Sequence, residues 1–185
     1  MPHGPPNPTH STEVSLQPGE LIITKADPKG LITYANRVFM RISGYAEHQL
    51  LGQPHNIIRH PDMPRGVYRM MWKALQAGEE FFGVVKNYTI DGNYYWVLAN
   101  ITPDYDRKGQ LQGYYSVRRR PSREAVEAAS RLYAEMRAIE ARTSKPAAPD
   151  ASAAWLTEEV ARTGQDYTSY ILSLNAGALG RGERA

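Results

Sequence analysis

The chain has 185 residues and a formal net charge of +3, and it contains no cysteine. This length predicts one domain with attached segments, and it suffices to bury a core without disulfide or metal staples. The absence of cysteine excludes disulfides, thiolate metal sites and thiol nucleophiles, and it fits a reducing compartment, so we expect a cytoplasmic protein.

The N-terminal segment, residues 1–19, is Pro-rich and polar, and we expect either a disordered arm or a cap on the domain. It lacks the basic start and the apolar stretch of a secretory signal, and no apolar run in the chain reaches the roughly 18 residues of a membrane span. The compact part begins at Glu20. Two branched apolar runs, 21–26 and 31–34, flank the turn residues 27–30 and predict a β-hairpin.

A helical section follows the hairpin. Asn36 opens a short helix with one apolar face, which ends at Ser43-Gly44. Residues 45–64 hold three prolines and show no long period, which predicts short helical turns and loops. In residues 66–77 the apolar side chains fall on one stripe, and Gly78 follows where a C-cap belongs, so we expect a longer helix there.

Three strands are predicted after this helix, over 81–89, 94–102 and 111–119, with turn residues between them. Two strands, several helices and three further strands predict an α+β fold with an antiparallel sheet and helices packed to one side. Arg118 to Arg120 form a basic run at the end of the last strand. We favour a solvated sheet edge for this run over a phosphate contact.

Beyond the sheet, residues 121–143 predict an amphipathic helix that starts near Ser122. We expect it to pack on its own domain because its apolar seam is short, and dimerisation through it is the alternative. A Pro/Ala/Ser linker is expected over 144–154, a further helix over 155–175 and a tail over 176–185. The apolar face of the further helix must be buried against the sheet, a second copy or a signalling partner.

The stretch from Pro54 to Pro64 is the densest in side chains that can carry chemistry. Arg59, His60 and Asp62 lie there between prolines that stiffen the backbone. The planar fork of Arg59 can bind a phosphate or a carboxylate. The competing interpretation is that His60 and Asp62 only cap turns.

The order of these elements resembles a PAS domain, and four motifs carry the resemblance: Gly30–Asn36, Ser43–Tyr45, Leu51–Asn56 and Gly113–Arg118. A second set of motifs resembles, more narrowly, the FAD-binding PAS domain of bacterial aerotaxis receptors: Pro54–Pro64, Met71-Trp72, Val85–Asn87, Gly92–Val97 and Ala99-Asn100. This likeness covers roughly residues 10–135. It implies a PAS domain over 20–120, with a five-stranded antiparallel sheet, helices on one face and a C-terminal helical extension.

The resemblance also implies that FAD is bound noncovalently, at positions that match Arg59, His60, Asp62, Asn36, Asn87 and Asn100. The family often has a tryptophan where this chain has Phe81. The resemblance therefore implies that this pocket contact is still aromatic, although the residue differs. Trp96 alternates with Asn100 along its strand and is expected on the same, ligand-lining face. Trp72 is interpreted as core packing, with stacking on the flavin as the alternative. The net charge of +6 over residues 21–120 fits an anionic cofactor.

The resemblance implies a sensor that relays redox or oxygen state to a partner protein, without covalent catalysis, a metal site, nucleic-acid binding or membrane insertion. Aerotaxis receptors continue into a membrane segment and a signalling domain that this sequence lacks, so we expect output through a separate protein or through self-association as a dimer. A charge change on the flavin is expected to repack Asn87 and Asn100 and to shift the following helix.

Several other functions compete with this interpretation. The absence of cysteine rules out a flavin–cysteinyl bond. The alternatives are a ligand-free PAS interaction module and a haem-binding PAS domain with His48, His55 or His60 as axial ligand. A flavoenzyme and a nucleic-acid binder rank below these, because no substrate cleft or recognition motif is visible.

Overall fold

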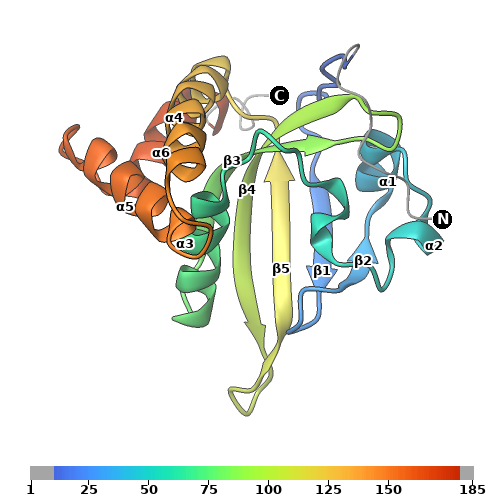
Figure 1. The fold of residues 1–185 in the computed structure, drawn as a ribbon. Coiled ribbons are helices and arrows are strands. Elements are labelled where there is room, and N and C mark those ends of the chain that lie inside the picture. The colour runs from blue at the N-terminus through green and yellow to red at the C-terminus, as the bar shows by residue number, and fades with distance from the viewer. Residues whose placement is uncertain (1–10, 180–185) are drawn as a thin grey trace.

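The computed structural model describes residues 11–179, so the part of the expected arm over 1–10 and the part of the tail beyond 179 lie outside the described residues. Its centre is a five-stranded antiparallel sheet in the order β2-β1-β5-β4-β3 (Figure 1). The strands are β1 (Ile22–Ala26), β2 (Ile32–Ala35), β3 (Phe81–Tyr88), β4 (Tyr94–Tyr105) and β5 (Leu111–Arg119). The predicted α+β class and antiparallel sheet are confirmed.

Turn and capping residues determine where the first hairpin and the first helix form. Asp27 accepts two backbone hydrogen bonds across the β1–β2 turn, and Gly30 supplies the left-handed φ of 83° that this turn needs. Asn36 caps α1 (Arg37–Ser43) by accepting a hydrogen bond from the backbone N–H of Phe39 at 3.1 Å. The predicted hairpin and the predicted first helix therefore form where their end residues place them.

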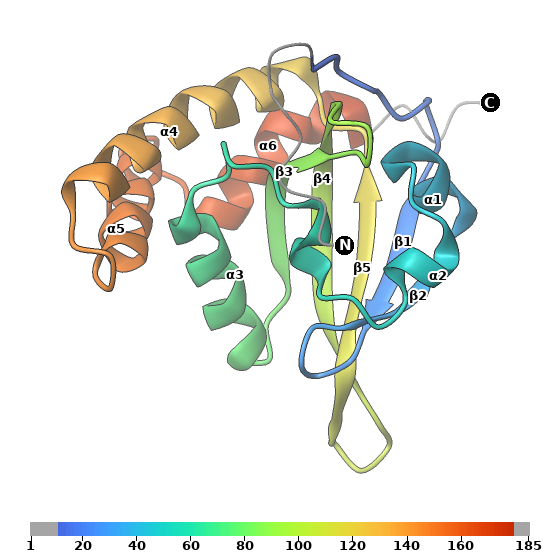
Figure 2. The same cartoon turned by 45° about the vertical axis from the view of Figure 1, so that its right-hand side comes forward.

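One face of the sheet is covered by the helices that connect β2 to β3. These are α1, α2 (Glu47–Leu50), the 3-10 helix η2 (His55–Ile58) and α3 (Arg65–Gln76). Figure 2 shows α1 and α2 beside β1 and β2, and α3 beside the β3 edge of the sheet. Alternate residues of β4, Tyr95 and Val97, are fully buried in the core on this face.

The C-terminal helices cover part of the opposite face. They are α4 (Arg123–Arg142), α5 (Ala148–Ala161) and α6 (Tyr167–Leu179), and Figure 1 shows them gathered at the β3 edge of the sheet. The intervening residues of β4, Trp96 and Leu98, are buried there in a second core that includes Tyr133 of α4. The hydroxyl group of Tyr133 donates a 2.6 Å hydrogen bond to the carbonyl oxygen of Val84. The expected C-terminal helical extension is thus packed on its own sheet.

The expected division of this extension is wrong in two places. The linker predicted over 144–154 becomes helical from Ala148, because its alanines favour a helix and Pro149 lies in the first turn, where no intrahelical N–H is needed. The helix predicted over 155–175 is instead two helices, which meet around Gly164 at a φ of 79°. The end of α6 returns to the start of α4, where Ser122 donates to the carbonyl oxygen of Leu174.

Within residues 11–179, no helix combines the length and the apolar character needed to cross a membrane.

Candidate functional site

A cavity of about 320 Å³ lies between the sheet and the helices of its first face. The sheet contributes Thr24, Ala26, Val85, Asn87, Ala99, Ile101, Tyr114, Ser116 and Arg118. The opposite wall comes from α3, through Tyr68, Met71, Trp72 and Leu75, and from the η2 segment, through His55, Asn56, Ile58 and Arg59. The cavity therefore combines apolar walls with a small number of polar groups, which is typical of sites for small organic ligands.

Arg118 is the buried cation of this cavity. Its residue is only 6% exposed, and its Nη2 atom lies 3.0 Å from Nε2 of His55. Its Nη1 atom is buried and has no hydrogen-bond partner among the described residues, and the same holds for Oγ of Ser116 and the hydroxyl group of Tyr95. Unpaired buried polar groups are costly, and both Arg118 and Ser116 line the cavity. A ligand there could therefore supply the hydrogen-bond partners that these two side chains lack.

His55 is neutral and fixed in one tautomer. A guanidinium can only donate, so Nε2 of His55 accepts from Arg118 and the ring proton resides on Nδ1. The hydroxyl group of Thr24 lies 3.1 Å from the same nitrogen. Burial, together with the charge of Arg118, lowers the pKa of His55 to about 3. The positive charge at this end of the cavity therefore belongs to Arg118.

Two predicted site residues, Arg59 and Asn87, do lie on the cavity wall. The Arg59 guanidinium carbon lies 4.0 Å from the ring centroid of Tyr68 on α3, in a cation–π contact that orients it. Asn87 is 4% exposed and pairs through its backbone with Arg59. This bridge ties β3 to the η2 segment beside the cavity.

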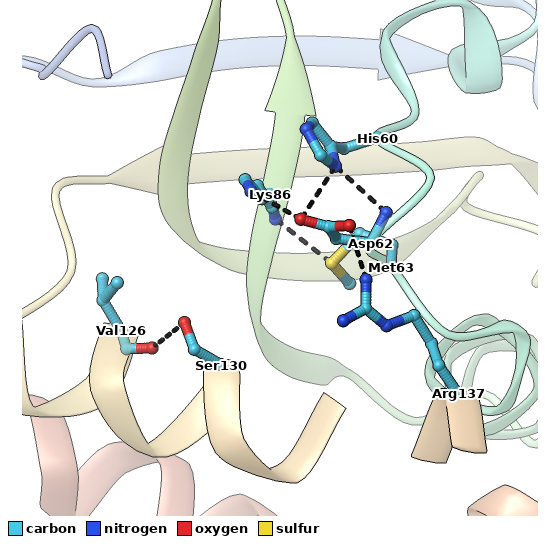
Figure 3. A network of polar contacts seen from close by, with 7 residues as sticks. All are labelled: His60, Asp62, Met63, Lys86, Val126, Ser130 and Arg137. Atoms are coloured by element: carbon cyan, nitrogen blue, oxygen red, sulfur yellow. Dashed lines mark hydrogen bonds and ion pairs between the residues drawn. The ribbon is translucent and has the colours of Figure 1, made fainter. Parts of the chain in front are cut away.

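Two others, His60 and Asp62, are not among the residues that line the cavity. Figure 3 shows them in a polar network with Lys86 and Arg137. Nδ1 of His60 accepts a 3.0 Å hydrogen bond from the backbone N–H of Asp62, and its ring packs on Tyr88 with centroids 4.1 Å apart. The Asp62 carboxylate accepts hydrogen bonds from Nζ of Lys86 at 2.7 Å and from Arg137 of α4. This geometry favours the competing interpretation, in which both residues shape the loop.

The charges of this cluster follow from its surroundings. Burial lowers the pKa of His60 to about 4, and Lys86 and Arg137 act in the same direction while Asp62 opposes them. Burial alone would raise the pKa of Asp62, but the hydrogen bond and charge of Lys86, with Arg137, hold it below its usual value. At neutral pH the cluster therefore contains a carboxylate between two cations and beside a neutral imidazole.

Trp96 and Asn100 share a face, as predicted, but that face is the opposite one. In β4 it is Ala99 that points into the cavity, so its neighbours along the strand point away. Trp96 stacks on Tyr133 of α4, with centroids 6.5 Å apart. The Nδ2 atom of Asn100 donates to a carboxylate oxygen of Glu80 at 2.9 Å. The structure thus places neither side chain where a ligand in the cavity could touch it.

Asn36 and Phe81 also lie outside the cavity lining. The amide oxygen of Asn36 accepts from the N–H of Ile23 at 3.2 Å in addition to capping α1, and its Nδ2 donates to the carbonyl oxygen of Leu21 at 2.8 Å. Asn36 therefore holds β1 against α1. Phe81 stacks on Tyr167 of α6, with centroids 5.8 Å apart, and belongs to the C-terminal core.

Trp72 and Arg118 have environments opposite to those expected. Trp72 is 36% exposed at the cavity rim and meets Tyr114 edge-on, with centroids 5.4 Å apart, so the core interpretation is wrong and the stacking alternative stays open. Arg118 is buried rather than solvated. The alternation of β5 is the sequence feature that indicates this burial, because Arg118 shares a face with Ser116 and lies opposite the buried Ile22 of β1.

Comparisons with known proteins agree with this architecture. Residues 32–118 match a family model described as the PAS fold. The chain is 43% identical over 124 residues to the aerotaxis receptor of Escherichia coli K12, which is 67% of this chain and 24% of the receptor. It is 33% identical over 104 residues to a nitrogen fixation regulatory protein of Klebsiella pneumoniae, which is 56% of this chain and 21% of that protein. The chain thus matches about a quarter or less of the length of these relatives.

Two solved structures of light-oxygen-voltage domains share the fold. One, from work on a flavin analogue in such a domain, has a TM-score of 0.52 and 27% identity, and covers 58% of this chain and 81% of that chain. The light state of the Aureochrome1 domain has a TM-score of 0.52 and 26% identity, and covers 64% of this chain and 91% of that chain.

Proposed function

Residues 32–118 of this chain belong to the PAS fold family, and from this premise we propose that the protein is a sensor that holds a flavin noncovalently in the cavity. The observation that carries the proposal is Arg118, a buried guanidinium in the cavity wall whose Nη1 has no partner among the described residues. The edge of a flavin ring carries carbonyl oxygens and ring nitrogens that can accept this hydrogen bond. The likeness to a light-oxygen-voltage domain studied with a flavin analogue supports the same ligand class.

The remaining lining residues fit the same group. Val85, Ala99 and Ile101 of the sheet face Met71 and Leu75 of α3, which gives apolar walls to a flat ring system. The amide of Asn87 and the hydroxyl of Ser116 would bind its polar edge, together with Arg118. When bound, a flavin supplies electron uptake and release with a change of charge or protonation.

Within this proposal the flavin is FAD, as the resemblance to the FAD-binding PAS domain of aerotaxis receptors implies. The 43% identity to the E. coli aerotaxis receptor supports that resemblance. The cavity volume is at the low end of the range for small-ligand sites, so it suits the ring system better than a whole dinucleotide. Arg59 is half-buried at the rim and Lys29 is exposed there, so both can meet phosphates that emerge from the cavity. This division of labour assigns Arg118 to the ring and Arg59 to the phosphates.

The proposed output is a change in how α3 and the η2 segment sit on the sheet. A change of charge in the cavity acts first on Arg118 and, through its hydrogen bond, on His55. Asn100 takes no part, because it lies on the opposite face. We assign the readout to a partner protein or a second copy of the chain in the cytoplasm, and we assign no chemical turnover to the site.

The geometry does not favour haem. The Nε2 atom of His55, which an iron ligand would have to present, accepts from Arg118. Nδ1 of His60 accepts from the backbone of Asp62, and His60 does not line the cavity. A ligand-free interaction module remains the competing function, and ligand binding distinguishes it from the sensor.

The test is a titration of ligand-free protein with FAD, FMN and riboflavin, followed by flavin absorbance and fluorescence. The proposal predicts saturable one-to-one binding, tightest for FAD. A folded protein that binds none of the three would leave the interaction module as the better account.

A further inference from the structure

The α3 wall of the cavity is attached to the C-terminal helices. Tyr68, Met71, Trp72 and Leu75 all come from α3, so a ligand in the cavity presses directly on this helix. The first turn of α3 in turn contacts α4 and α5, on the side away from the cavity. Three separate contacts make this attachment.

The first contact is the Asp62 carboxylate, in the loop between η2 and α3. It accepts hydrogen bonds from Arg137 of α4 and from Lys86 of β3 (Figure 3). The loop is therefore fixed to both the sheet and α4. Asp62 and Arg137 are each close to half exposed, which limits the strength of this pair on its own.

The second contact is Glu140, near the end of α4. Its carboxylate accepts from the backbone N–H groups of Arg65 at 3.1 Å and Gly66 at 2.9 Å. The N-cap of α3 is Pro64, which makes no side-chain cap, so a carboxylate from another helix caps α3 and meets its positive end. The same carboxylate accepts from the hydroxyl group of Ser152 on α5 at 2.7 Å, which joins the three helices at one point.

The third contact is the close approach of α5 to Gly66. A Cβ atom at this position would lie 2.2 Å from Oγ of Ser152 and 2.9 Å from the backbone nitrogen of Ala153. Gly66 has an ordinary helical φ, so the close packing, not the backbone conformation, requires glycine here. Any movement of the α3 N-terminus must therefore move α5 or separate from it.

We propose that Arg137, Glu140 and Ser152 form a latch through which occupancy of the cavity controls the docking of α5 and α6. This regulation rests on the proposed function, because flavin is the ligand that acts on α3. A ligand that packs on α3 holds its first turn in place and so favours the docked helices. By linkage, a change that undocks α5 must weaken the ligand by the same factor. The undocked helices would then be free for a partner.

The experiment combines FAD titration with hydrogen exchange of the α5 amides, in the wild type and in three variants. Glu140→Ala removes the cap, Gly66→Ala inserts a methyl group into the contact, and Ser152→Ala is the mildest change, in case the first two fail to fold. Glu127→Ala is the control, because Glu127 lies on α4 and pairs only with Arg123 among the described residues.

We expect FAD to slow α5 exchange in the wild type about fivefold or more, within the usual range of coupling between sites. The latch variants should lose most of that protection and bind FAD correspondingly more weakly, while the control follows the wild type. A wild type that binds FAD with α5 exchange unchanged overturns the latch and leaves the flavin site standing.

The flavin-free protein separates the two proposals. There, Glu140→Ala should speed exchange in the first turns of both α3 and α5, whereas Glu127→Ala should not. If the protein shows this result but binds no flavin, the mechanical link between α3 and α5 is supported and the flavin assignment is contradicted. Faster exchange in α5 alone would contradict the latch.

Discussion

Arg118 and His55 meet across the cavity, with Nη2 of Arg118 3.0 Å from Nε2 of His55. The arginine comes from the last strand of the sheet and the histidine from the η2 segment, so their hydrogen bond joins the two walls. It uses one nitrogen of the guanidinium and leaves Nη1 buried without a partner among the described residues. A polar ligand that accepts from Nη1 would complete the arrangement, and this relationship underlies the first prediction.

Arg118→Met should weaken flavin binding by at least about tenfold, which corresponds to about 1.4 kcal/mol, because methionine fills similar space without a donor. Without ligand, the variant should be as stable as the wild type or more stable, since an incompletely paired buried charge is removed. Titration and thermal unfolding measure the two effects. Arg119→Met, at the neighbouring exposed position, is the control and should leave affinity unchanged. Equal affinities in all three proteins would remove Arg118 from the site.

Arg59 and Asp62, which are close in sequence, should behave differently. Arg59→Ala should weaken FAD severalfold and riboflavin little, because its assigned contact is with the phosphates. Asp62→Asn should lower stability by about 1–3 kcal/mol through the loss of charge-assisted hydrogen bonds to Lys86 and Arg137, and should weaken both flavins alike. Isothermal titration with the two ligands separates these patterns. A loss of riboflavin binding in Arg59→Ala as large as the loss of FAD binding would contradict the assignment to phosphate.

The protein should become less stable as the pH falls from about 6.5 to about 4. His60 has its pKa lowered to about 4 from an ordinary value of 6.5, so in this window the unfolded state binds the proton and the folded state does not. The free energy of unfolding therefore falls with falling pH, by at most about 1.4 kcal/mol per pH unit for this histidine. His55, with a pKa of about 3, acts with the same sign and extends the decline.

His60→Asn tests the source of this decline, because its amide oxygen can still accept from the backbone of Asp62. In urea unfolding at a series of pH values, the free energy of unfolding of His60→Asn should fall less steeply with falling pH than that of the wild type. His48→Asn, which removes an exposed histidine, is the control for the loss of an imidazole as such. If the free energy of unfolding of His60→Asn falls as steeply with pH as that of the wild type, His60 is not the source of the decline.

The two tryptophans should differ in their effect on a bound flavin. Trp72 lies at the cavity rim and can quench flavin fluorescence by contact, so Trp72→Phe should brighten the bound flavin. Trp96 is separated from the cavity by the sheet, so Trp96→Phe should leave the brightness unchanged even if it lowers stability. Steady-state emission at full occupancy is the measurement. Brightening in Trp96→Phe alone would indicate that the flavin lies on the face opposite the cavity, which would contradict the proposed site.

The sequence predicts the fold well because the residues that begin and end each element are close to it in the sequence. The Asn36 cap, the Asp27–Gly30 turn and the period-two strands each specify their own element, and the structure has all of them. The C-terminal segments were less predictable. The proline at position 149 favours a linker, but proline is tolerated in a first helical turn. The surrounding alanines and the packing of α5 on α3 and α4 favour the helix.

The site was predicted only in part, because alternation says which residues share a strand face but not which face meets a ligand. Alternation correctly predicts that Trp96 and Asn100 share a face, but the predicted ligand-lining face is the wrong one. The basic neighbours of Arg118 favour solvent exposure, whereas the pairing of β5 with β1 and β4 determines the face on which its side chain lies. The role of Asp62 depends on Arg137, 75 residues later, and no local pattern connects them.

The most direct test of the central claim is the visible absorption spectrum of the purified protein, before and after incubation with excess FAD and removal of the unbound ligand. The account predicts the two bands of a protein-bound flavin, with FAD released intact on heating. A Soret band would contradict the ligand assignment and make a histidine the residue of interest. A folded protein that stays colourless after incubation with FAD would contradict the flavin site itself.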